Sequence, residues 1–142
     1  QEPPFVVVDP VMISTSGHRL IDEDAQQSMI DNVFPYADLV TPNKYEAEAL
    51  LGGRKLTCPE DVERGAQEIL NMGANAVLIK GGHSLEEGAT LSSSLDSNAT
   101  IGYAQDYFLS EGDHTDRLCD GPRGVWLRTD RFDTPNTHGT GC

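Results

Sequence analysis

The chain has 142 residues and a formal net charge of −13, from 23 Asp and Glu against 10 Lys and Arg. Its length suffices for one domain with a hydrophobic core, and an apolar fraction of 37% is typical of a globular protein rather than a disordered one. The charge argues against nucleic acid and anionic membranes as partners, and no run approaches the roughly 18 apolar residues that cross a bilayer.

The first predicted elements are a strand and a helix. Residues 5–8 are a run of aromatic and β-branched side chains, which is typical of a strand buried on both faces. The strand ends at Asp9-Pro10, because proline cannot donate to the hydrogen-bond ladder. Residues 22–34 begin with acidic residues and continue with apolar residues at helical spacing, and Pro35 follows, so we predict a helix there.

The same alternation continues along the chain. A short strand is predicted at residues 38–41, before Pro42, and a helix at residues 43–51, before two glycines. Residues 58–72 are predicted to form another helix, since proline and acidic residues occupy its first turn. A further apolar strand follows at residues 76–80. Strands that alternate with helices predict right-handed crossovers and a parallel sheet.

Beyond the third strand the pattern changes. Residues 84–100 are rich in Ser, Glu, Asp and Gly with little periodicity, which is typical of a surface-loop insertion. Two strands are predicted at residues 103–110 and 124–128, and we expect them to form an antiparallel edge to the parallel sheet. No internal repeat or second domain is evident, so residues 1–142 are interpreted as part of a single domain.

Polar residues lie where the predicted strands end. Asp9 follows the first strand, Asn43 and Glu46 follow the second, and Lys80 ends the third. A glycine turn at residues 139–141 follows the last strand. In open α/β sheets ligands bind at the carboxyl ends of the strands. We therefore expect these residues to converge on one edge of the sheet.

Each of these residues also has a purely structural interpretation. The Asp9 carboxylate suits a hard cation such as Mg²⁺, although Asp-Pro is also a common turn at a strand end. Asn43 and Glu46 have the spacing of a capping box, and a carboxylate there can also hold a water or Mg²⁺ beside a phosphate. The Lys80 ammonium suits a nucleotide phosphate, or it extends into solvent at the sheet edge.

The most informative stretch is Asn-Thr-His-Gly-Thr-Gly-Cys at residues 136–142. Its glycines let successive N–H groups point at one site, which would form an anion hole for a transferred phosphate. In its thiolate form, Cys142 beside it could accept the proton of a substrate hydroxyl. An ordinary glycine turn is the alternative, and neither the Walker pattern nor the dinucleotide-binding pattern is present.

In order and spacing these segments resemble the hydroxymethylpyrimidine/phosphomethylpyrimidine kinases of thiamine biosynthesis, which belong to the ribokinase-like superfamily. The resemblance implies an α/β fold with three α/β/α layers, a mostly parallel central sheet and an antiparallel edge. The matching runs are Val8-Asp9-Pro10-Val11-Met12, Ser16-Gly17, Thr41-Pro42-Asn43, Glu46-Ala47-Glu48, Lys80-Gly81-Gly82-His83 and Asn136-Thr137-His138-Gly139-Thr140-Gly141-Cys142.

The resemblance implies ATP-dependent phosphorylation of hydroxymethylpyrimidine and then of its monophosphate, with Mg²⁺. Cys142 stands where sugar kinases of the superfamily carry a catalytic Asp, which favours a pyrimidine kinase. The implied roles are ATP binding by Lys80, Asn43, Thr137, Gly139 and Gly141, metal binding by Asp9 and Glu46, and catalysis by Cys142 with Gly139, Thr140 and Gly141.

Two other functions stay open, a pyridoxal or pyridoxine kinase of the same superfamily and a nucleotide-binding module without catalysis. Family members have further segments before and after the matched runs, so we expect the chain to be incomplete at both ends and inactive by itself. The parent protein could be a homo-oligomer. Independently of that, it could be fused to a thiamine-phosphate synthase, as some relatives are. Three cysteines without a Cys-x-x-Cys pair argue against disulfides or zinc and favour the cytoplasm.

Overall fold

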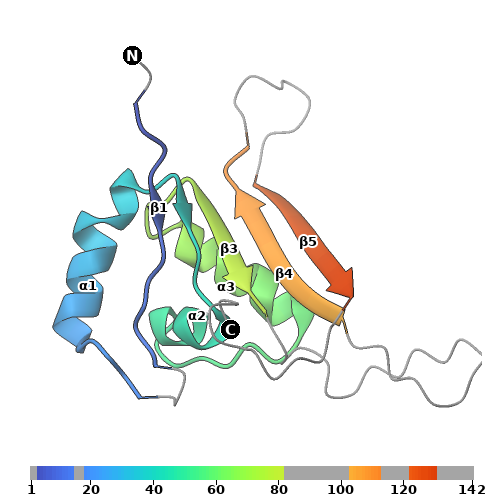
Figure 1. Cartoon of the computed structure of the whole chain (residues 1–142), viewed down its shortest axis with the longest axis horizontal. Coiled ribbons are helices and arrows are strands. Elements are labelled where there is room, and N and C mark those ends of the chain that lie inside the picture. Colours follow the sequence, from blue (N-terminus) through green and yellow to red (C-terminus); the bar gives the residue numbers. More distant parts are fainter. Residues whose placement is uncertain (1–2, 15–17, 82–102, 113–121, 131–142) are drawn as a thin grey trace, which may run out of the picture.

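The computed structural model describes residues 3–14, 18–81, 103–112 and 122–130. Within these ranges the chain forms one sheet with the strand order β1-β2-β3-β4-β5, together with three α-helices and a 3-10 turn (Figure 1). The elements are β1 (Val7–Val8), α1 (Glu23–Asn32), η1 (Phe34–Tyr36), β2 (Leu39–Val40), α2 (Lys44–Leu50), α3 (Pro59–Leu70), β3 (Ala76–Lys80), β4 (Tyr103–Ser110) and β5 (Arg123–Asp130).

The predicted strands and helices are confirmed in type and order, and the differences lie at their ends. β3 and β4 have the predicted limits, whereas β5 is longer than predicted at both ends. The first helix ends at Asn32, and Pro35 then lies inside the short turn η1. Proline is tolerated there because it occupies the first turn, where its missing N–H would have no helical partner. The insertion predicted at residues 84–100 lies outside the described residues.

The described sheet is mixed. β1 pairs with β2 and β2 pairs with β3 in parallel, while β3, β4 and β5 pair in antiparallel fashion. The parallel strands are joined by crossovers that contain helices, as parallel pairing requires. This arrangement confirms the antiparallel edge predicted for the second half of the chain.

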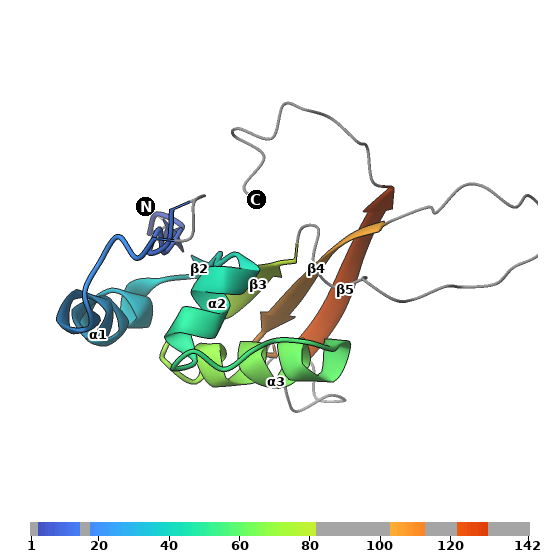
Figure 2. The same cartoon turned by 90° about the horizontal axis from the view of Figure 1, so that it is seen from below.

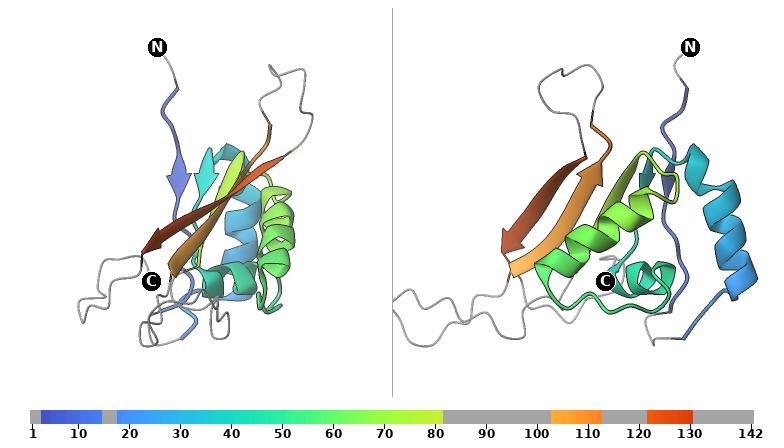
Figure 3. Two further views of the ribbon diagram at one scale, coloured as in Figure 1. Left: turned by 90° about the vertical axis from the view of Figure 1, so that its right-hand side faces the viewer. Right: turned by 180° about the vertical axis from the view of Figure 1, so that it is seen from behind.

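The helices α1, α2 and α3 lie on the same face of the sheet (Figures 2 and 3). Between this face and the helices lies the core, to which the sheet contributes Val40, Val77 and Ile79 and helix α3 contributes Ala66 and Ile69. The described residues therefore supply the sheet and one helical layer of the expected three-layer architecture. None of the described helices has the length and apolar character needed to span a bilayer.

The prediction that residues 5–8 form a strand buried on both faces is wrong for this structure. β1 is the first strand in the sheet order, and Phe5 and Val7 are 71% and 54% exposed. Val8 packs against the core because it shares the helix-covered face with Val40, its partner in β2. Val7 points to the opposite face, which none of the described helices covers.

Candidate functional site

The described candidate residues meet at the carboxyl ends of the three parallel strands. The Lys80 Nζ at the end of β3 lies 3.3 Å from Oδ1 of Asp9, which follows β1. The Lys80 backbone N–H donates to the Pro42 carbonyl at 2.9 Å, and Lys80 forms an isolated parallel bridge with Asn43. The structure thus brings together residues from the ends of β1, β2 and β3, as the sequence predicted.

Asn43 and Glu46 form the capping box at the start of α2. The Asn43 side chain accepts a hydrogen bond from the Glu46 N–H at 2.9 Å, and Glu46 Oε2 accepts one from the Asn43 N–H at 2.8 Å. The box satisfies N–H groups that the first turn of a helix leaves without a helical acceptor. The structural interpretation of this pair is therefore correct, and it also fixes Glu46 beside the strand ends.

Glu46 is a buried carboxylate, with only 3% of the residue exposed. Burial raises its pKa above the ordinary value of 4.5, because charge is costly away from water, and the negative charge of Asp9 raises it further. Hydrogen bonds from the backbone N–H groups of Asn43 and Met12 act in the opposite direction, as does the positive charge of Lys80. A cation placed between Glu46 and Asp9 would relieve this unfavourable charge.

The donor set suits a metal ion that is shared with a ligand. Among the residues that the structure describes, no three His, Cys, Asp or Glu side chains gather closely enough to hold a metal ion by themselves. Mg²⁺, however, is usually held by one or two carboxylates, with phosphate oxygens and waters as its remaining ligands. Asp9, whose side chain is 52% exposed, and Glu46 fit that pattern.

Lys80 does not simply extend into solvent. Its side chain is 23% exposed and pairs with Asp9, which is half exposed. Ion pairs in contact with water are worth little, so the ammonium can exchange Asp9 for another anion at small cost. The site can therefore present the Lys80 ammonium to an anionic ligand, which leaves the Asp9 carboxylate available to a cation.

The remaining predicted site residues lie outside the described residues. These are Thr137, Gly139, Thr140, Gly141 and Cys142. The anion hole and the catalytic cysteine therefore stay predictions from the sequence.

One contact at the site was missed by the sequence reasoning. The Met12 backbone N–H faces the Glu46 carboxylate and lowers its pKa, so the segment after β1 lies beside the start of α2. The turn at Asp9-Pro10, closed by a 2.9 Å hydrogen bond from the Val11 N–H to the Asp9 carbonyl, brings it there. A backbone N–H donor cannot be recognised from the sequence. Only the Asp-Pro turn indicated that the chain changes direction here.

Comparisons with a family model and with individual known proteins agree on the kind of protein that this chain resembles. The family model described as phosphomethylpyrimidine kinase matches residues 1–142. The chain is 39% identical over 137 residues to the hydroxymethylpyrimidine/phosphomethylpyrimidine kinase of Rhizobium meliloti, covering 96% of this chain and 42% of that protein. It is 38% identical over 137 residues to a probable thiamine biosynthetic bifunctional enzyme of Oryza sativa, covering 96% of this chain and 21% of that protein.

Two solved structures show the same likeness. The pyridoxal kinase from Staphylococcus aureus in complex with AMP-PCP has a TM-score of 0.70 at 31% identity, covering 97% of this chain and 41% of that one. The phosphomethylpyrimidine kinase from Clostridium difficile has a TM-score of 0.60 at 31% identity, covering 89% of this chain and 42% of that one.

The chain therefore spans about two-fifths of the length of these bacterial relatives. The structural neighbours confirm the predicted ribokinase-like α/β fold. Because the family model matches the whole chain, the chain belongs to the phosphomethylpyrimidine kinase family.

Proposed function

We propose that the chain is part of an ATP-dependent kinase that phosphorylates hydroxymethylpyrimidine and then its monophosphate. The observation that carries this proposal is the group of Asp9, Glu46 and Lys80 at the ends of the parallel strands, in a chain of this family. Two carboxylates and an ammonium at one edge are the groups that a metal-bound nucleotide requires. The names of the bacterial relatives support the pyrimidine substrate.

In this proposal Lys80 binds a phosphate oxygen of ATP, and Asn43 lies beside the phosphates. Asp9 and Glu46 hold Mg²⁺, which when bound neutralises charge on the phosphates. Since phosphoryl transfer depends mainly on positioning and charge stabilisation, the fixed geometry of the Asn43–Glu46 box would be useful to catalysis.

The end of the chain supplies the rest of the proposed reaction. Backbone N–H groups of Gly139, Thr140 and Gly141 stabilise the charge on the transferred phosphoryl group, and Thr137 binds ATP. The Cys142 thiolate takes the proton of the substrate hydroxyl as the hydroxyl oxygen attacks the terminal phosphorus of ATP. The phosphate ester forms and ADP leaves.

A pyridoxal kinase is the second candidate, and one observation favours it. The pyridoxal kinase from Staphylococcus aureus gives a TM-score of 0.70, against 0.60 for the phosphomethylpyrimidine kinase from Clostridium difficile. The family model and the names of the curated relatives favour the pyrimidine substrate. A nucleotide-binding module without catalysis is the third.

The first experiment compares substrates in the full-length protein that contains this chain. With ATP and Mg²⁺, we expect a higher kcat/KM for hydroxymethylpyrimidine than for pyridoxal or pyridoxine. The reverse order would favour the second candidate. No turnover of any of these alcohols would support the non-catalytic module. The 142-residue chain alone is expected to be inactive, so turnover by it would contradict that expectation.

Two variants test the roles proposed for Lys80 in ATP binding and for Cys142 in catalysis. Lys80→Met should lower kcat/KM for ATP about a hundredfold, because a charged phosphate contact is lost. Lys55→Met is the matched control, since it removes a different lysine–carboxylate pair, with Lys55 Nζ 2.6 Å from Glu48 Oε2, and it should leave kcat/KM for ATP within about twofold. Cys142→Ala should keep nucleotide binding and lose turnover. Equal effects of Lys80→Met and Lys55→Met would contradict the assignment of Lys80.

Three features of the whole protein are also proposals. Relatives in Oryza sativa and Geobacter sulfurreducens are named as bifunctional, which supports a parent fused to a thiamine-phosphate synthase. We also propose a homo-oligomer, which sedimentation of the full-length protein would test, and a cytoplasmic location, which cell fractionation would test.

A further inference from the structure

Two short segments before α1 pair with each other and are called here the paired arms, residues 12–14 and 18–20. Ile13 and Arg19 form an antiparallel bridge. The Leu20 N–H donates to the Met12 carbonyl at 2.8 Å, and the Ser14 N–H donates to the His18 carbonyl at 2.8 Å. The first arm follows the Asp9-Pro10 turn, so its position is linked to the candidate site.

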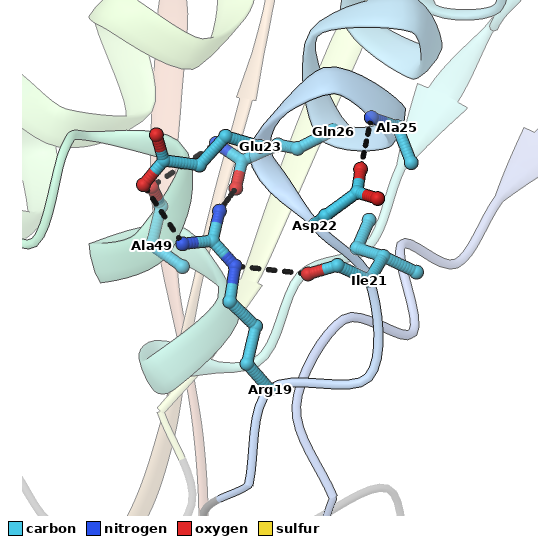
Figure 4. A network of polar contacts seen from close by, with 7 residues as sticks. All are labelled: Arg19, Ile21, Asp22, Glu23, Ala25, Gln26 and Ala49. Atoms are coloured by element: carbon cyan, nitrogen blue, oxygen red, sulfur yellow. Dashed lines mark hydrogen bonds and ion pairs between the residues drawn. The ribbon is translucent and has the colours of Figure 1, made fainter.

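Arg19, in the second arm, is the centre of a polar network (Figure 4). Its Nε donates to the Ile21 carbonyl at 2.9 Å, and one Nη donates to Gln26 Oε1 of helix α1 at 2.8 Å. The Gln26 Nε2 in turn donates to the Ala49 carbonyl of helix α2 at 3.2 Å. The network therefore links the second arm to α1 and, through one amide, to α2.

The network acts mainly by fixing the orientation of its side chains, and its ion pair contributes little. The remaining Nη of Arg19 lies 3.2 Å from Glu23 Oε1, but the Glu23 side chain is 87% exposed, so this ion pair is weak. The other contacts join the planar guanidinium to neutral acceptors in fixed directions. Gln26 uses both ends of its amide, which sets its orientation as well.

Both ends of this chain of contacts meet helix α2. At one end the Met12 N–H lies beside the Glu46 carboxylate and lowers its pKa, and at the other Gln26 bonds to the carbonyl of Ala49, three residues further along the helix. Met12 and Arg19 lie in opposite arms, joined by main-chain pairing. The contacts form a closed circuit that meets α2 at Glu46 and at Ala49.

We propose that Arg19 is a positioning residue for the candidate site. Through Gln26 it holds the paired arms against α2, and so it fixes the Met12 N–H beside the Glu46 carboxylate. Arg19 itself has no contact with the groups assigned to ATP or metal among the described residues. Its kinetic consequence rests on the function proposed above, whereas its structural consequence does not.

The structural test measures hydrogen exchange of the Met12 amide in the full-length protein. Arg19→Ala and Gln26→Ala should each speed exchange about tenfold, and the double variant should be no faster than either, because both act through one circuit. Arg19→Lys keeps the charge but loses the planar fork, and should follow Arg19→Ala. Unchanged exchange in Arg19→Ala would overturn the proposal.

Two controls separate this effect from the loss of a surface charge. Arg54 is matched to Arg19, since it is 48% exposed against 45% and pairs with Glu68 at 2.8 Å. Arg54→Ala and Glu23→Gln should each leave Met12 exchange within about twofold of the original protein. An equal increase in these controls would show a general loosening of the fold and overturn the proposal.

The kinetic test asks whether the circuit matters for the reaction. Arg19→Ala should lower kcat about tenfold and leave KM for the pyrimidine within about twofold, since displacement of a group at the reacting centre costs rate rather than uniform binding. A lower melting temperature with unchanged kcat would show a purely structural role and overturn the proposal. If the original protein has no kinase activity, the proposed function fails, and Met12 exchange still decides the role of Arg19.

Discussion

Glu46 is both a helix cap and a buried charge. Its carboxylate accepts a hydrogen bond from the Asn43 N–H, and this bond and the Met12 N–H nearby favour the ionised form. Burial and the negative charge of Asp9 disfavour that form more strongly, so the pKa of Glu46 is raised. The folded protein therefore stores an unfavourable charge at the place where the proposed function needs a metal ion.

The raised pKa predicts how stability depends on pH. The folded state holds the Glu46 proton more tightly than the unfolded state, whose pKa is near the ordinary 4.5. Between 4.5 and the raised value, the folded state binds more protons, so the free energy of unfolding falls as pH rises. The Glu46→Gln variant lacks this pH-dependent contribution to the free energy of unfolding. Relative to that variant, the original full-length protein should therefore become more stable as pH falls from about 7 to about 5.

Urea unfolding at both pH values, without metal, checks this prediction. Asn43→Ala is the control, because it removes the cap but keeps the carboxylate, and it should cost about 1 kcal/mol at both pH values. A difference between the original protein and Glu46→Gln that does not change with pH would refute the prediction.

At the scale of elements, the hairpin of β4 and β5 is fastened to α3 by aromatic side chains. The rings of Tyr107 and Trp126 have centroids 4.9 Å apart, and the Trp126 Nε1 donates to Glu63 Oε1 at 2.8 Å. Burial, followed by the negative charge of Glu63, raises the pKa of Tyr107. The hairpin thus adds to the sheet an edge whose inner face is packed and hydrogen-bonded to a helix.

Gly124 makes this packing possible. A Cβ at position 124 would lie 1.9 Å from Tyr107 Oη and 2.7 Å from Cζ, and the Tyr107 residue is only 7% exposed. Gly124→Ala should therefore lower the free energy of unfolding by about 1–3 kcal/mol, the usual cost of overpacking. Chemical unfolding followed by Trp126 fluorescence would measure it.

The neighbouring substitution Val125→Ala is the control, since Val125 is 51% exposed and should cost less. A double-mutant cycle identifies the cause. In a Tyr107→Ala background, the cost of Gly124→Ala should largely disappear because the clashing ring is gone. The same cost in both backgrounds would disprove the clash.

Particular residues show how far the sequence could predict this molecule. The apolar run of β3 and the Asn43–Glu46 box are local patterns, and both were found as predicted. The pairing of Lys80 with Asp9 could be expected only as a shared edge, because its distance depends on the sheet. The exposure of Val7 was missed because burial depends on what covers each face. The hydrogen bonds of Arg19 were missed because they follow no sequence pattern.

At the scale of the whole molecule, the sheet carries exposed apolar side chains on the face opposite the helices. Side chains alternate across a strand, and the register places Leu78, Phe108 and Val125 in one row on that face, with Leu127 on the same side of β5. Val7, Val125 and Leu127 are 54%, 51% and 47% exposed. Exposed apolar surface of this kind promotes association in water.

The net charge of −13 opposes that association. Two forces of different range therefore compete in the 142-residue chain, a short-range apolar attraction and a long-range repulsion that salt screens. We predict that the chain by itself binds a hydrophobic dye and forms larger species as salt rises from about 0.01 M to about 0.15 M, where the screening length shortens to roughly 8 Å.

The double variant Val125→Thr with Leu127→Thr should reduce dye fluorescence at least twofold and keep the chain monomeric over the same salt range. The reason is that two exposed apolar side chains of β5, on the face opposite the helices, become polar. Dye titration and sedimentation velocity provide the two measurements. Tyr36→Ser removes an even more exposed apolar side chain, 77% exposed in η1, and serves as the control. If Tyr36→Ser suppresses association as strongly as the double variant, association does not depend on the sheet face. If salt has no effect, charge repulsion does not limit it, and the apolar surface alone sets how the chain associates.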